Sequence, residues 1–208
     1  MGPTRLELRK PVIAAIDGYC VAGGLELALM CDLRVMEEDA KVGILNRRFG
    51  VPLIDGGSVR LPELIGLSRA LDLIITGRIV EAREALQMGL VNRVAKVGTG
   101  FGLAMQLARE IAMVPQECLR VDRASAYHAT FASKSLEESL QFESDNALHV
   151  ISEESLEGAQ KFMKGLGRHG KFNVNPVAEK EPWELERSAM KEEATAGKIK
   201  DTDKEKMS

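Results

Sequence analysis

The stretch Lys10–Met36, KPVIAAIDGYCVAGGLELALMCDLRVM, decides which fold this 208-residue chain is expected to adopt. Its first part, Val12 to Ile16, is a short, β-branched apolar run of the kind that forms a buried strand. A turn containing Gly23 and Gly24 follows, and the helix-like run Leu25 to Met30 comes next. A strand that enters a helix through such a turn points free backbone N–H groups at one place. That place suits a phosphate, a carboxylate or a thioester oxygen that gains negative charge.

Glu26 is the single charged residue between Gly18 and Met30. An isolated carboxylate among apolar neighbours indicates an acid/base group, although a helix residue that faces solvent would read the same way. Gly23 and Gly24 have the same two interpretations, because they can be turn glycines or N–H donors to a bound oxygen. The first interpretation of Glu26, with Gly23 as the donor, is the hypothesis carried forward.

Composition excludes several classes of protein. Apolar residues make up 45% and charged residues 28% of the chain, which is typical of a globular domain. The net charge of −3 gives no reason to expect nucleic acid or an anionic membrane as a partner. No run is long and apolar enough to span a membrane, and no signal region opens the chain. Three cysteines without metal spacing indicate reduced thiols, no metal site and a soluble intracellular protein.

The order of expected elements is β/α first and helical later. Short strands are expected at Asp32–Met36, Lys41–Ile44 and Val91–Val94, and Pro52–Gly57 is expected to be a turn into a helix that Asp55 could cap. Helices are predicted over the following ranges: Ser68–Thr76, Glu81–Met88, Leu103–Met113, Glu117–Ser133, a capping-box helix from Ser135 to about Val150, and Ser155–Gly165.

The same pattern divides the chain into three regions. Residues 1–110 are expected to form an α/β core, and 111–172 a helical region. Residues 173–208 are rich in Lys and Glu, and they are expected to form a charged flexible tail because they cannot bury enough apolar surface.

Several linked motifs resemble one family. Besides the opening stretch, these are GVPLIDGGSVRLPELIGLSRALDLIITGRIV, EAREALQMGLVNRV and SLEGAQKFMKGLGRHGKF, in the same order and spacing. Together, over Lys10 to Phe172, they resemble the enoyl-CoA hydratase/isomerase (crotonase) superfamily. The resemblance implies a partial spiral of ββα units followed by a helical trimerisation region. It also implies a homo-oligomer, a trimer or a hexamer, that acts on coenzyme A thioesters of acyl groups without a metal or redox cofactor.

The resemblance assigns roles to individual residues. Gly23 aligns with the family's backbone donor to the thioester oxygen, and Glu26 with its first catalytic glutamate. Asn46 stands where hydratases place a second glutamate, and an amide cannot act as an acid or base. Asp55 lies one residue from a position where some members carry another carboxylate.

Two basic residues near the family's C-terminal end complete the implied site. Arg168 and Lys171 could reach a phosphate of coenzyme A in the assembled oligomer, or they could belong to a solvated chain end. Neither interpretation follows from their spacing alone.

The resemblance also has a gap at the start. The part of the family's fold that carries the second oxyanion donor finds no counterpart upstream of Lys10, so a truncated chain with impaired activity is expected. Hydration of a 2-enoyl-CoA is the default reaction. Isomerisation, decarboxylation and thioester hydrolysis remain alternatives, as does a non-catalytic isoform that binds full-length subunits. A mitochondrial, peroxisomal or cytosolic location stays open.

Overall fold

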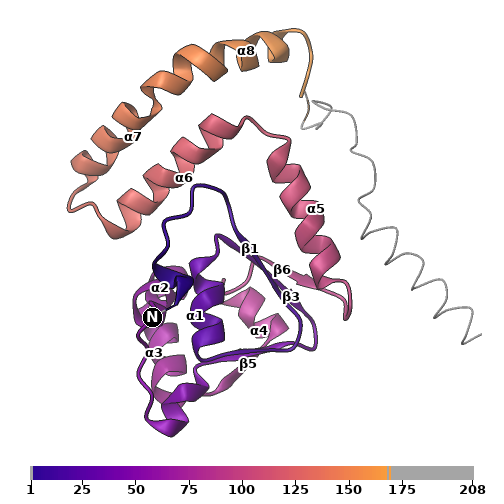
Figure 1. Cartoon of the computed structure of the whole chain (residues 1–208), viewed down its shortest axis with the longest axis vertical. Helices are drawn as coiled ribbons and strands as arrows, with labels where there is room; N and C mark the ends of the chain where they lie inside the picture. Colours follow the sequence, from indigo (N-terminus) through magenta and orange to yellow (C-terminus); the bar gives the residue numbers. More distant parts are fainter. Residues whose placement is uncertain (1, 168, 170–208) are drawn as a thin grey trace, which may run out of the picture. The chain divides into compact units, whose positions relative to one another are not determined.

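A computed structural model describes residues 2–167 and 169 of the chain. One compact unit spans Met1–Lys164, and a second begins at Gly165. The first unit is a mixed α/β structure whose C-terminal part is helical, as the sequence predicted (Figure 1). The boundary expected between residues 110 and 111 falls inside this unit and stays a prediction. The tail expected at 173–208 lies outside the described residues.

Two three-stranded sheets organise the first unit. The first sheet has the parallel order β1-β3-β6, with Ile13 opposite Leu33 and Val35 opposite Arg93. In the second sheet β2 runs parallel to β4, and β4 runs antiparallel to β5. The strands are β1 (Ile13–Ile16), β2 (Tyr19–Val21), β3 (Leu33–Glu37), β4 (Lys41–Gly43), β5 (Ile79–Glu81) and β6 (Arg93–Ala95). Each ββ turn therefore adds one strand to each sheet.

Helices follow the strands, and the described elements after β6 are all helical. The helices are α1 (Gly23–Met30), α2 (Gly57–Ile65), α3 (Leu67–Thr76), α4 (Ala82–Gln87), α5 (Gly100–Ala112), α6 (Gln116–Phe131), α7 (Leu136–Val150) and α8 (Leu156–Met163). Two short 3₁₀ segments, Pro3–Arg5 and Leu45–Phe49, and a π-helical segment, Ile151–Ser155, complete the described elements. Figure 1 shows α6 and α7 lying side by side, and they pack against each other.

Strand β3 separates two apolar cores because its side chains alternate. Met36 is fully buried in the main core, together with Leu25 of α1 and Leu61 of α2. Val35 points to the opposite face, where it packs with Leu107 of α5 in a smaller core. The apolar face of α5 thus covers the first sheet from the side opposite α1.

The helical region is tied to the sheets through one carboxylate. Asp32 Oδ1 accepts hydrogen bonds from Arg123 Nε at 2.7 Å and from the Tyr127 hydroxyl at 3.0 Å. Its Oδ2 accepts one from the backbone N–H of Val12 at 2.7 Å. The start of β1, the end of α1 and the middle of α6 therefore meet at a half-buried ion pair.

Two local predictions have clear outcomes. The capping box of α7 is confirmed, because Ser135 Oγ accepts the N–H of Glu138 at 3.1 Å. The predicted N-cap of α2 is wrong. Gly56, with φ +99°, occupies that position, and the Asp55 carboxylate instead accepts hydrogen bonds from the Gly2 N–H and the Thr4 hydroxyl.

Candidate functional site

The N-terminus of α1 is open to solvent and held in an unusual conformation. Ala22, the residue before the helix, has φ +53° and ψ −126°, which is strained for a residue with a Cβ. Its N–H donates to Gly43 O at 2.9 Å, and its carbonyl accepts the Glu26 N–H at 3.1 Å. Gly23 is the first helical residue and is exposed, so its N–H has no preceding helical carbonyl to bind.

Glu26 lies one turn further along α1, and its side chain is directed into the protein. The residue is only 4% exposed. Its Oε1 accepts backbone hydrogen bonds from Asp55 at 3.0 Å and from Gly57 at 2.9 Å. Within the described residues no hydrogen bond to Oε2 is found. One carboxylate oxygen is therefore fixed by backbone N–H groups at the start of α2 and just before it.

Glu37, at the end of β3, repeats this arrangement at another helix. Its two carboxylate oxygens accept the N–H groups of Gly98 at 2.6 Å and Gly100 at 2.7 Å, at the start of α5. Glu37 is 5% exposed. A buried glutamate that anchors a helix N-terminus is thus a structural device in this fold. What distinguishes Glu26 is the exposed N–H of Gly23 one turn away.

Asn46 lies in the segment Leu45–Phe49, which the sequence analysis had not predicted to be helical. Its side-chain amide N–H donates to Val51 O at 2.9 Å. Its Oδ1 is a buried atom for which no partner is found in the described part of the chain. An amide is neither an acid nor a base, so this side chain cannot transfer a proton as a carboxyl group would.

Asp55 contacts Glu26 through its backbone, but its carboxylate binds a different part of the chain. Its backbone N–H binds Glu26, whereas its carboxylate binds the Gly2–Thr4 segment. Arg60 reinforces this contact by donating to Asp55 O at 3.2 Å and to Thr4 O at 2.7 Å. Sequence reasoning missed Thr4 and Arg60, because nothing in a short polar lead-in indicates that it packs against residues more than fifty positions away.

The remaining candidates do not add chemistry here. Arg168 and Lys171 lie outside the described residues. Burial raises the pKa of Cys20 from 9.0 to about 11, with Cys31 adding to the shift, so this thiol beside the turn is protonated at neutral pH.

The described residues contain no group of three or more His, Cys, Asp and Glu side chains that could hold a metal ion. None of the described helices has the length and apolar character needed to cross a membrane.

Comparison with known proteins identifies the family of the chain. The profile of the enoyl-CoA hydratase/isomerase family matches residues 5–169. The chain is 35% identical over 160 residues to a probable enoyl-CoA hydratase of Mycobacterium leprae and 45% identical over 116 residues to a putative enoyl-CoA hydratase of Thermus thermophilus. The chain belongs to the enoyl-CoA hydratase/isomerase family.

Solved structures agree with this assignment. The enoyl-CoA hydratase of Bacillus anthracis superposes with a TM-score of 0.72 at 36% identity, covering 76% of this chain and 61% of that one. That of Mycobacterium tuberculosis superposes with a TM-score of 0.73 at 32% identity, covering 77% and 64%. The match to the M. leprae protein covers 76% of this chain and 61% of that protein. The match to the T. thermophilus protein covers 55% of this chain and 45% of that protein. It therefore spans about half to two thirds of the length of these relatives.

Proposed function

We propose that this chain carries the acyl-thioester site of an enzyme of coenzyme A metabolism, with Gly23 and Glu26 as its reactive groups. The supporting observation is one turn of α1. This turn carries the exposed Gly23 at the helix N-terminus and, three residues later, the buried carboxylate of Glu26, whose Oε1 accepts two backbone N–H groups. The N–H group stabilises negative charge on the thioester oxygen, and the positive end of the helix dipole adds to this effect.

Glu26 is the group that moves a proton. Hydration of a 2-enoyl-CoA adds a hydroxyl to the β-carbon and a proton to the α-carbon, and the negative charge passes through an enolate oxygen next to Gly23. A single donor of this kind contributes about 3–4 kcal/mol to the transition state.

Isomerisation is the second candidate, and Asn46 favours it. Its amide donates to Val51 O, and an amide is neither an acid nor a base. Hydration with two carboxylates needs a second acid or base, whereas isomerisation needs one. Glu26 can take a proton from one carbon of a 3-enoyl-CoA and return it to another, and the double bond moves into conjugation with the carbonyl. Decarboxylation and thioester hydrolysis find no comparable support.

The helical region supports an assembly proposal. Several apolar residues of α7, α8 and the segment between them are exposed, at 51–62% of their surface: Leu140, Leu148, Ile151 and Leu156. A stripe of this size is typical of a protein–protein contact. We propose that it forms the contact of a homotrimer or hexamer. A non-catalytic subunit that joins full-length relatives through this stripe is the alternative from another class.

The test is a product analysis. The chain is incubated in D2O with a 2-enoyl-CoA and, separately, with a 3-enoyl-CoA, and products are read by NMR. A 3-hydroxyacyl-CoA product supports hydration, and conversion of the 3-enoyl-CoA into a 2-enoyl-CoA supports isomerisation. An unchanged spectrum with both substrates, together with no binding of coenzyme A by calorimetry, contradicts the enzyme proposal and leaves the subunit alternative.

A further inference from the structure

The two N–H groups that bind Glu26 come from one turn with a glycine at its centre. Glu26 Oε1 accepts the N–H groups of Asp55 and Gly57, at 3.0 and 2.9 Å, and these residues flank Gly56. Gly56 is in the left-handed region, with φ +99° and ψ 6°. Backbone N–H groups around a left-handed residue converge to form a concave anion site. The anion in this site is the carboxylate of Glu26.

Gly56 does not fix the conformation of this turn by itself. Glycine adopts positive and negative φ about equally readily, because it has no Cβ. A change of φ at Gly56 would turn the N–H of Gly57 away from the oxygen that the N–H of Asp55 binds. The peptide plane between Asp55 and Gly56 turns with this φ. A group that binds the carbonyl of Asp55 therefore resists the change.

Arg60, in the first turn of α2, is such a group. Its Nη1 donates to Asp55 O at 3.2 Å, and its backbone N–H donates to Gly56 O at 2.9 Å. Its guanidinium also covers Gly56 so closely that a Cβ at this position would overlap with Nη1. One residue thus holds the carbonyl groups on both sides of the Gly56 α-carbon.

We propose that Arg60 is a positioning residue, whose guanidinium locks the turn at Gly56 and thereby holds the carboxylate of Glu26. The inference rests on the proposed function, in which Glu26 moves a proton. Glu26 is 4% exposed, and none of the ion pairs found among the described residues includes it. Its orientation therefore depends on the N–H groups of Asp55 and Gly57.

The shape of the guanidinium suits this role. Its donors lie in a rigid planar fork that can bind two carbonyl groups at once, whereas a lysine ammonium is a point charge on a flexible stem. The second carbonyl is that of Thr4, which accepts from Arg60 Nη2 at 2.7 Å. Thr4 is 3% exposed, so the far side of the fork is anchored on buried structure. Arg60→Lys keeps the charge of the side chain and loses this geometry.

The first measurement follows the amides of Asp55 and Gly57 in the full chain by NMR. Arg60→Met removes the guanidinium and keeps most of the apolar stem. Hydrogen exchange at both amides is expected to rise about tenfold or more, because the turn opens more often. The two amide signals are expected to move toward their positions in Glu26→Ala, which lacks the acceptor. Arg60→Lys is expected to lie between Arg60→Met and the unmodified chain.

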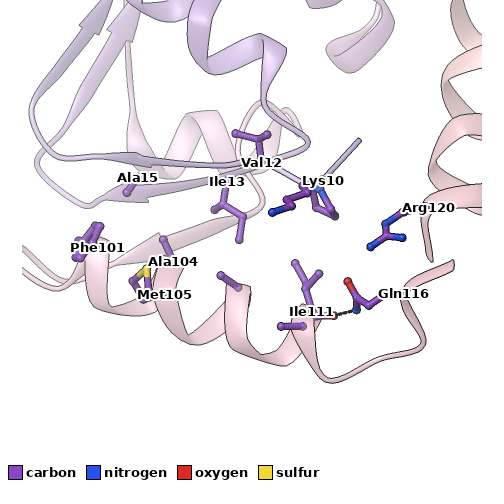
Figure 2. A pocket seen from close by; sticks show the side chains of 13 residues that line it. Lys10, Val12, Ile13, Ala15, Phe101, Ala104, Met105, Ile111, Gln116 and Arg120 are labelled. Carbon is purple, nitrogen blue, oxygen red and sulfur yellow. Dashed lines mark hydrogen bonds between the residues drawn. The ribbon is translucent and has the colours of Figure 1, made fainter. Parts of the chain in front are cut away.

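Arg120→Met is the matched control. Arg120 lines an apolar pocket of about 420 Å³ between β1 and α5, and no residue of the turn at Gly56 lines this pocket (Figure 2). Exchange at the Asp55 and Gly57 amides is expected to stay unchanged in this variant. Equal increases in Arg60→Met and Arg120→Met would show a general loosening of the chain and would overturn the proposal.

The second measurement is the turnover of an enoyl-CoA per folded molecule. In Arg60→Met kcat is expected to fall about tenfold or more, with KM within about threefold, because the change acts on the orientation of Glu26. Arg60→Lys is expected to recover part of kcat. An unchanged kcat beside raised exchange in Arg60→Met overturns the inference.

The two measurements separate this inference from the proposed function. Absence of turnover in the unmodified chain contradicts the proposed function, and the exchange data then still decide whether Arg60 holds Glu26. Unchanged exchange at Asp55 and Gly57 in Arg60→Met overturns the inference. If Arg60→Met does not fold, unchanged exchange in Arg60→Lys overturns it in the same way.

Discussion

At the scale of single residues, Gly57 decides how Glu26 is held. A Cβ at this position would lie 2.9 Å from Glu26 Cγ and 3.0 Å from Oε1. Gly57→Ala is therefore expected to displace the Glu26 carboxylate, lower kcat about tenfold or more and reduce the free energy of unfolding by about 1–3 kcal/mol. Steady-state kinetics with the substrate identified by NMR, and urea denaturation, measure the two effects.

Gly100 provides the matched control. A Cβ there would lie 2.8 Å from Glu37 Cγ, so Gly100→Ala disturbs the same kind of carboxylate anchor at α5. A similar loss of stability with kcat unchanged is expected. Equal losses of kcat in the two variants would show that Gly57 acts on activity only through stability.

Cys20 gives a prediction about pH. Burial raises its pKa to about 11, so the reactive thiolate is scarce at neutral pH and forms only as the pH approaches that value. The rate of Cys20 alkylation by iodoacetamide, followed by mass spectrometry of the modified peptide, is expected to rise through pH 11 rather than through the ordinary value of 9.0. An inflection near the ordinary value would show that the thiol is open to solvent.

At the scale of residues, the sequence predicted which side chains are candidates for the site, but not which groups hydrogen-bond to them. Glu26 was identifiable because an isolated charge in an apolar helix is rare, and its burial agrees with that reasoning. Its two N–H donors come from Asp55 and Gly57, about thirty residues away, and no local pattern indicates them. Asp55 was predicted to cap α2 because local propensity favours it, but Gly56 occupies the N-cap position and the Asp55 carboxylate binds the Gly2–Thr4 segment.

At the scale of elements, Asp32 holds α6 against the sheets. Asp32→Asn removes the charge that faces Arg123, at side-chain exposures of 15% and 21%, and weakens three hydrogen bonds. The free energy of unfolding is expected to fall by about 1.5–3 kcal/mol in urea denaturation. Hydrogen exchange at α6 is expected to rise more than exchange at β3.

Asp72→Asn is the control for this prediction. Asp72 pairs with Arg78 at the surface, with side-chain exposures of 45% and 35%, and Arg78 keeps its second partner, Glu84. The expected loss is below about 1 kcal/mol. If both variants lose the same stability, Asp32 is not the link between α6 and the sheets.

Helices were predictable from the sequence where the helical spacing of apolar residues extended over many residues. The helices predicted from Leu103, Glu117 and Ser135 each occur in the structure within a few residues of the expected bounds. Strands β2 and β5 were not predicted, because three residues are too few to show an alternating pattern. Their formation depends on pairing with β4, which is a non-local contact.

At the scale of the whole molecule, the stripe on α7 and α8 is expected to decide the oligomeric state. Leu148→Glu and Ile151→Glu, at positions 62% and 55% exposed, place charges on it without disturbing a core. The proposed trimer or hexamer is expected to lose its threefold contact, and sedimentation equilibrium measures the mass. An unchanged mass in both variants would show that the stripe is not the contact.

The fold as a whole was predictable because several motifs agreed in order and spacing, and the family match and the superpositions confirm it. The homo-oligomer was expected from the family resemblance alone. An exposed apolar stripe results from which surfaces the folded chain leaves uncovered, and a single sequence does not show this.

The most direct test of the central claim compares Glu26→Gln with Glu37→Gln. Both glutamates are buried and accept backbone N–H groups at a helix start, and only Glu26 lies beside the exposed Gly23. Turnover of an enoyl-CoA per folded molecule is measured for both variants and for the unmodified chain. The account predicts a loss of about 100-fold or more in Glu26→Gln and none in Glu37→Gln. Equal turnover in the two variants would contradict it.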